Sequence, residues 1–172
     1  MIRPTIGQQL DFAWRAALPV TLTLLLLFLT MLPWHLPKLG TVGAACVFVS
    51  VFFWSLHQPG LMSMWGALAI GLVHDLMTLA PFGIGLLVIL LVHGVAVSRR
   101  KAVIALPFLL EWLVFGLVAA GASLLTWLLV SLLHEQFVDL GEALQLFLLA
   151  FTCYPPLAAV FAWVERRYIS GA

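Results

Sequence analysis

The sequence predicts an all-α integral membrane protein with six transmembrane helices and with both termini in the cytoplasm. The 172 residues are 64% hydrophobic and only 9% charged, whereas about a quarter of the residues in a soluble domain are charged. The apolar residues fall into six runs, each close to the roughly 20 residues that a spanning helix needs. Seven basic residues lie on one side of these runs and only Lys38 on the other, and the Lys/Arg-rich side is cytoplasmic. The seven are Arg3, Arg15, Arg99, Arg100, Lys101, Arg166 and Arg167.

The six expected spans form one membrane domain over residues 1–172. They cover residues 17–34, 41–57, 61–79, 82–98, 107–133 and 142–164. An even number of spans returns the chain to the side on which it began, so both termini are expected on the Lys/Arg-rich side. The tryptophans agree with this topology, because they fall toward the membrane–water interfaces that their amphipathic rings prefer.

Prolines, glycines and charges predict the breaks between the spans. The segment from His35 to Gly40 ends the first span, and Gln58-Pro59-Gly60 turns the chain from the second span into the third. Ala80-Pro81 separates the third span from the fourth, which is followed by Arg99-Arg100-Lys101. A polar loop over residues 134–142 separates the last two spans.

The fifth apolar segment is too long to be one simple span. From Val103 to Leu133 it would form a helix about 46 Å long, against a hydrocarbon core of about 30 Å. Pro107 suits the first turn of a helix, where its missing N–H would have no partner. We therefore expect the span to begin near Pro107, with residues 101–106 along the interface. Glu111 would then lie in the first turns and could meet headgroups, the helix N-terminus or the nearby basic cluster.

Two features of the last two spans favour close helix packing. Small residues cluster in the fifth span at Gly116, Ala119, Ala120 and Gly121, and such faces let helices approach closely. Pro155-Pro156 interrupts the sixth span and leaves backbone carbonyls near residues 151–152 without their helical donors. Neighbouring helices, Thr152 or water must supply other donors. The proline pair predicts either a kink or, alternatively, a broken helix that lines a substrate cavity.

Asp75 is the residue most suggestive of a function, because ionisable groups inside a membrane are costly. It follows Ala67 and Gly71 at spacings of four, so the three share one face of the third span. Small residues there would admit a neighbouring helix, which could donate a hydrogen bond to the carboxylate. Two alternatives are a plain helix end in wet headgroups and the handling of a proton or substrate.

The residue types argue against an enzyme, a metal protein and a nucleic-acid-binding protein. No two histidines have the helical spacing of metal ligands. Ser123 has no nearby base, and Asp75 is the only aspartate expected near the membrane interior. We therefore expect no catalytic residue, no metal ligand and no cofactor. The basic clusters are interpreted as cytoplasmic anchors that meet anionic lipid, namely Arg99, Arg100, Lys101, Arg166 and Arg167.

The region from Gly66 to Gly83 resembles MreD, the bacterial rod shape-determining membrane protein family. Its third span reads Gly71-Leu72-Val73-His74-Asp75-Leu76 and is followed by Phe82-Gly83. A short cytoplasmic N-terminus, six spans and a proline-containing last span that ends in Glu165-Arg166-Arg167 extend the likeness over nearly the whole chain.

The resemblance implies a non-enzymatic scaffold subunit of the elongation complex that synthesises peptidoglycan and maintains cell shape, in the bacterial inner (cytoplasmic) membrane. The implied partners are the single-span protein MreC, RodA and a class B penicillin-binding protein through the complex, the MreB filament on the cytoplasmic side, and membrane lipid. The fold of the family is similar to the substrate-binding component of energy-coupling factor transporters. That similarity supplies an alternative function, the substrate-binding membrane subunit of a small-molecule, vitamin-type uptake transporter.

The sequence favours the scaffold over the transporter subunit. A vitamin site needs several convergent polar groups, and the outer halves of the spans offer few. These are Thr41, His74, Asp75, Thr78, Thr126 and Ser131. The first span, leucine-rich from Leu18 to Leu24, also lacks the Ala-x-x-x-Ala surface with which such subunits typically dock. We therefore expect small-residue faces near Gly71, Asp75 and Gly83 to bind the membrane helix of an MreC-like partner.

Overall fold

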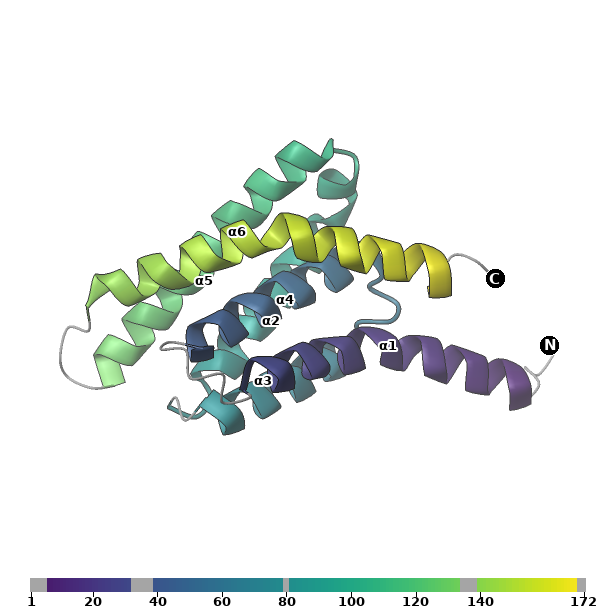
Figure 1. Ribbon diagram of the computed structural model, residues 1–172, viewed down its shortest axis with the longest axis horizontal. Helices are drawn as coiled ribbons and strands as arrows, with labels where there is room; N and C mark the ends of the chain where they lie inside the picture. The colour runs from purple at the N-terminus through teal and green to yellow at the C-terminus, as the bar shows by residue number, and fades with distance from the viewer. Residues whose placement is uncertain (1–5, 32–38, 79–80, 134–138, 170–172) are drawn as a thin grey trace.

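The computed structural model describes residues 6–31, 39–78, 81–133 and 139–169, and helices account for all the regular structure within them. The elements are α1 (Ile6–Met31), α2 (Leu39–His57), α3 (Met64–Thr78), α4 (Ile84–Ile104), α5 (Phe108–Leu133), α6 (Leu140–Val164) and the π-helical turn η1 (Glu165–Ile169). Successive helices run back and forth along the molecule, so the start of α1 and the end of α6 lie at the same end (Figure 1). This end is called the terminal end below, and the opposite one the far end.

The predicted all-helical fold is confirmed, and the bounds of α2, α5 and α6 lie within two residues of the expected spans. Helix α1 begins at Ile6, well before the predicted 17, while the predicted end at 34 lies outside the described residues. Helix α4 continues to Ile104 rather than ending at 98. Residues 101–104 are therefore helical, because Arg and Lys are good helix formers and the chain breaks only just before Pro107.

Three helices are long and apolar enough to cross a membrane, over Gly40–His57, Phe108–Leu133 and Leu140–Arg167. Shorter apolar helices cover Ala17–Thr30 and Met64–Thr78. Helix α4 is in neither group, since its last turns carry Arg99, Arg100 and Lys101. Many large apolar side chains are exposed on the outer helices, and Leu117 is 76% exposed. Such a surface suits lipid rather than water, and the described structure is consistent with a membrane protein.

Helix α2 is the centre of the molecule. It packs against α1, α3, α4 and α6, and every side chain from Ala45 to Leu56 is buried. The apolar window of α2 is 72% buried, whereas those of α5 and α6 are 28% buried. Its buried hydroxyl groups find partners, as in the 2.6 Å hydrogen bond between Ser50 Oγ and Thr23 Oγ1 of α1. The outer helices are therefore arranged around α2.

The prolines of α6 lie inside a continuous helix, and a neighbouring helix supplies one of the missing donors. Pro155 has no N–H to offer the carbonyl of Phe151, four residues earlier. The indole Nε1–H of Trp112, on α5, donates to that carbonyl at 2.9 Å. The two rings also stack, with centroids 4.5 Å apart. The donor that this carbonyl was predicted to need therefore comes from a neighbouring helix, α5.

Replacing Trp112 by phenylalanine should lower the stability of the α5–α6 pair by about 1–3 kcal/mol, because the Phe151 carbonyl loses its donor. The stacked ring is retained, so the change isolates the hydrogen bond. We would heat the detergent-solubilised protein and measure the monodisperse fraction by size-exclusion chromatography. Trp65→Phe is the control, since Trp65 is 78% exposed. Equal melting temperatures for the two variants would contradict the role of the indole.

Candidate functional site

The carboxylate of Asp75 is buried at the far end of the molecule and binds the start of α4. Its Oδ2 accepts hydrogen bonds from the backbone N–H of Gly83 at 2.8 Å and of Leu86 at 3.1 Å. These amides belong to the N-terminal turn of α4, where the first N–H groups lack helical partners and a negative charge is favoured. Asp75 is only 3% exposed. A side chain of α3 therefore caps α4 across the turn that joins them.

Three glycines allow α4 to approach Asp75. Gly83 has a φ of +100°, a left-handed conformation that side chains rarely adopt. A Cβ on Gly71 would lie 2.8 Å from the Cα of Leu86, so α3 and α4 cross at close range. A Cβ on Gly85 would collide with Asp75 Oδ1 and lie 2.6 Å from His74 Nδ1. The α3–α4 junction is thus built around small residues.

Asp75 also affects which ring nitrogen of His74 carries the proton. Oδ1 of Asp75 lies 3.4 Å from Nδ1 of His74. A carboxylate only accepts hydrogen bonds, so the Nδ1 of a neutral His74 carries the proton and its Nε2 carries a lone pair. The His74 side chain is buried, and its Nε2 has no hydrogen-bond partner. His74 lines a cavity at this end of the molecule.

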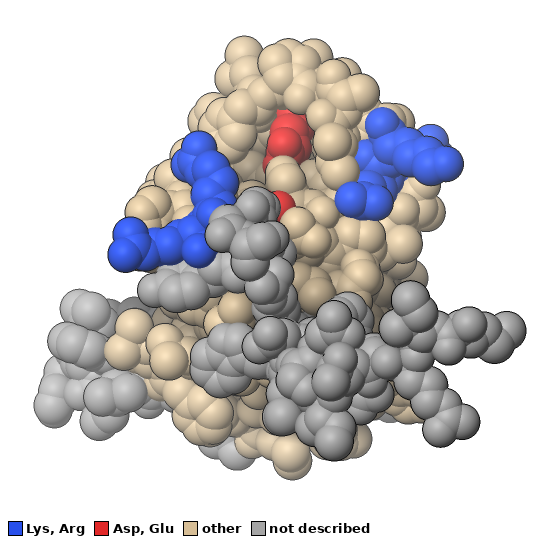
Figure 2. Space-filling model, turned by 90° about the vertical axis from the view of Figure 1, so that its right-hand side faces the viewer, with Lys and Arg blue, Asp and Glu red and all other residues tan. Residues whose placement is uncertain are grey.

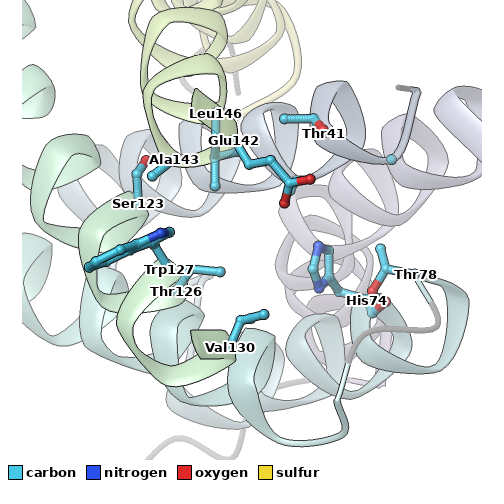
Figure 3. Close-up of a pocket in the computed structure, with 12 residues that line it drawn as sticks. Thr41, His74, Thr78, Ser123, Thr126, Trp127, Val130, Glu142, Ala143 and Leu146 are labelled. Carbon is cyan, nitrogen blue, oxygen red and sulfur yellow. Dashed lines mark hydrogen bonds between the residues drawn. The ribbon is translucent and has the colours of Figure 1, made fainter. Parts of the chain in front are cut away.

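The cavity, called the far-end pocket below, has a volume of about 340 Å³ and lies between α2, α3, α5 and α6. Its polar lining comes from Thr41, His74, Thr78, Ser123, Thr126, Trp127 and Glu142. In Figure 3, His74 and Thr78 lie on one side of the open space and Ser123, Thr126 and Trp127 on the other, while the Glu142 carboxylate extends between them. Like His74 Nε2, the buried Ser123 Oγ has no hydrogen-bond partner. The volume suits a small molecule or a headgroup.

The structure brings together the three residues predicted to bind a partner. Gly71, Asp75 and Gly83 all lie at the α3–α4 junction, and Gly71 and Asp75 are buried. The contacts described for them are within the chain: the hydrogen bond expected for Asp75 from a neighbouring helix comes from α4. Within the described residues, no group of three or more His, Cys, Asp or Glu side chains could hold a metal ion.

The basic residues that were interpreted as anchors lie together at the terminal end. Figure 2 shows two groups of Lys and Arg atoms on this face, with acidic atoms between them. Arg99, Lys101, Arg166 and Arg167 are exposed. Arg100 differs, because its Nε donates to the Leu56 carbonyl at 2.8 Å and so caps the C-terminal end of α2.

The residues between the basic groups were not predicted to form a cluster. Glu111 is 8% exposed, and its Oε1 accepts a 2.6 Å hydrogen bond from the Tyr154 hydroxyl group and lies 3.9 Å from His57 Nε2. Headgroups, the helix N-terminus and the basic cluster were the expected partners of Glu111, but its described contacts are these two. Nearby, Gln58 Nε2 donates to Glu165 Oε1 at 2.7 Å. The position of Glu111 in the first turn of α5 was a usable signal, but Tyr154 is too distant in sequence to be matched with it.

A second concave feature, called the α4–α5 groove below, lies along the sides of those two helices. Its volume is about 250 Å³ and its lining is apolar, from Val88, Leu91, Val92, Val95, Val118, Gly121, Ala122 and Leu125. Gly121 is exposed, and a Cβ added there would meet no atom within 4 Å. By contrast, a Cβ on Gly116, five residues earlier on α5, would lie 2.7 Å from the Phe151 ring. Gly116 therefore serves packing inside the chain, whereas Gly121 does not.

Comparisons of the chain with protein-family models, with curated proteins and with solved structures found no match. The class that the described residues define is an all-helical protein with helices suited to a membrane.

Proposed function

We propose that this protein crosses the bacterial inner membrane six times, with both termini in the cytoplasm. The alternation of α1 to α6, together with the start of α1 and the end of α6 at the terminal end, supports an even number of crossings (Figure 1). The described Lys and Arg residues lie at that same end, which favours a cytoplasmic orientation for it. The far-end pocket then opens toward the outer side of the membrane.

The proposed function is that of a non-enzymatic scaffold subunit in peptidoglycan elongation, which binds the membrane helix of an MreC-like protein. The resemblance of the Gly66–Gly83 region to MreD supplies this function. The observation that carries it is the α4–α5 groove, where Gly121 is exposed midway along a long apolar helix and a Cβ would meet no atom within 4 Å. Glycines at such positions let a second membrane helix approach closely.

The α4–α5 groove replaces the α3–α4 junction as the proposed contact surface. Gly71 and Asp75 are already occupied by α4 and offer little surface to a second protein. The groove presents exposed Leu91 and Val95 beside Gly121, which suits the ridges of an apolar helix. Asp75 therefore supports partner binding only by holding α4 in place.

Gly121→Leu should abolish co-purification of the MreC-like partner without lowering the amount of the protein in the membrane. A Cβ at this position has no neighbour within 4 Å, so the leucine side chain can extend into the groove. Gly94→Leu is a matched control, because Gly94 is also exposed on a helix and has no neighbour within 4 Å, yet does not line the groove. We would pull down each tagged variant in detergent and quantify the partner. Equal recovery from both variants would contradict the groove as the contact surface.

One observation favours the alternative, a substrate-binding membrane subunit of a vitamin-type uptake transporter. The polar side chains in the far-end halves of the helices were expected to be too few for a vitamin site. They nevertheless converge on one pocket, which is lined by Thr41, His74, Thr78 and Thr126. Recovery of an ATPase pair with a coupling subunit in the same pull-down, instead of the MreC-like protein, would establish the transporter subunit.

A further inference from the structure

We propose that the far-end pocket binds a primary ammonium group, either of a soluble amine or of a phosphatidylethanolamine headgroup. The proposal rests on which hydrogen-bonding roles the pocket leaves open, and it does not depend on the α4–α5 groove or on a scaffold function.

Most polar atoms of the pocket are hydrogen-bond acceptors. The hydroxyl group of Thr78 donates its only hydrogen to the His74 carbonyl at 2.8 Å, and that of Thr126 donates to the Ala122 carbonyl at 2.9 Å. Each oxygen therefore presents only lone pairs to the cavity. In a neutral His74 whose proton lies on Nδ1, toward Asp75, the Nε2 is likewise an acceptor. A ligand that supplies donors would complement these acceptor atoms.

The charge of the pocket is negative. Glu142 contributes a carboxylate that extends into the open space (Figure 3), and no Lys or Arg is among the lining residues. A second carboxylate, that of Asp75, lies directly behind His74. An ammonium group supplies three N–H donors and one positive charge, so it complements both the acceptors and the carboxylate.

Two buried atoms without partners indicate that the site is built for a ligand. His74 is 6% exposed and Ser123 is 2% exposed, yet His74 Nε2 and Ser123 Oγ make no hydrogen bond. Leaving buried polar atoms unpaired is unfavourable, and native proteins rarely do so without a reason. The two residues come from α3 and α5 and lie on opposite sides of the same cavity (Figure 3).

The test compares a primary ammonium group with its trimethylated counterpart, which has no N–H donor. The full-length protein in maltoside detergent is titrated with ethanolamine or with choline, whose quaternary nitrogen keeps the charge but has no N–H. In parallel, it is placed in nanodiscs of phosphatidylglycerol mixed with either phosphatidylethanolamine or phosphatidylcholine. The readouts are the melting temperature and, for the nanodiscs, retained lipid measured by native mass spectrometry.

We expect ethanolamine, phosphatidylethanolamine or both to raise the melting temperature, and their methylated counterparts to have no effect. Stabilisation by ethanolamine alone identifies a soluble amine, whereas stabilisation by phosphatidylethanolamine alone, with retention of that lipid, identifies the headgroup. Glu142→Gln should weaken the binding by about tenfold or more, as the loss of a charge-assisted hydrogen bond predicts. His74→Phe should do the same, and Asp139→Asn, a nearby exposed carboxylate outside the pocket lining, should not.

The proposal is overturned if choline stabilises the protein as well as ethanolamine does, or if neither amine nor either lipid changes the melting temperature. It is also overturned if Glu142→Gln, which alters an exposed side chain and leaves the core intact, binds the amine as tightly as the unmodified protein.

Discussion

Replacing Gly85 by alanine is expected to destabilise the protein by at least about 3 kcal/mol, since it combines overpacking with the loss of buried hydrogen bonds. The added Cβ would occupy the space of Asp75 Oδ1 and crowd His74 Nδ1. The carboxylate cannot simply move aside, because its Oδ2 is held by the amides of Gly83 and Leu86. Either α4 must shift away from α3, or the cap must break. The protein should reach the membrane in reduced amount and melt at a lower temperature.

Gly94→Ala is the control for Gly85→Ala. Both glycines lie within α4, and alanine raises intrinsic helix propensity at either position by about 1 kcal/mol. A Cβ on Gly94 meets no atom within 4 Å, so that variant should be at least as stable as the unmodified protein. Fluorescence-detected size-exclusion chromatography after heating measures both. A Gly85→Ala protein as stable as Gly94→Ala would mean that α3 and α4 do not pack as described.

Asp75→Ala should have the second-largest effect, a loss of about 2–4 kcal/mol, because it leaves two backbone amides of α4 without an acceptor. It also removes the partner of His74 Nδ1. Asp75→Asn should recover part of this loss, since the amide oxygen can still accept from Gly83 and Leu86. The measured quantities are the melting temperature in detergent and the level of protein in the membrane.

A second capping aspartate provides the comparison for Asp75→Ala. Asp139 accepts a hydrogen bond from the backbone N–H of Gly141 at 3.1 Å and caps α6, but it is exposed. Water can replace its carboxylate, so Asp139→Ala should cost only about 0.5–2 kcal/mol. A loss for Asp75→Ala no greater than that for Asp139→Ala would show that burial adds nothing to the α3–α4 cap.

Local signals in the sequence were sufficient to predict most of the helices. Pro107 marked the start of α5, and Gln58-Pro59-Gly60 marked the end of α2, because proline and glycine act on the backbone within one turn. The start of α1 was missed because the prediction was based on apolar runs. The polar residues Gln8, Gln9, Asp11 and Arg15 interrupt such a run, although the helix continues through them. The last turns of α4 were missed in the same way, because Arg99, Arg100 and Lys101 end its apolar run.

The candidate site was only partly predictable. The spacing of Gly71 and Asp75 correctly indicated a close helix crossing with a hydrogen bond to the carboxylate, because both belong to one helix face. The donors to this carboxylate, the backbone N–H groups of Gly83 and Leu86, are placed by the turn at Gly83. The spacing of apolar residues in the sequence does not predict the conformation of that turn. The far-end pocket was missed for a different reason. Thr41, His74, Ser123 and Glu142 come from four helices, and only their packing brings them together.

The buried position of α2 has a consequence for the order in which the protein is made. This helix leaves the ribosome before α4 and α6, which later cover much of it. Until they arrive, its sides are open to whatever surrounds it. From Ala45 to Leu56 nearly all of its side chains are apolar or small, and the two that carry hydroxyl groups are serines, Ser50 and Ser55. Such a helix is stable in lipid alone. In the proposed six-span topology, α2 can therefore reside in the bilayer during synthesis and exchange lipid for protein neighbours as each later helix is inserted.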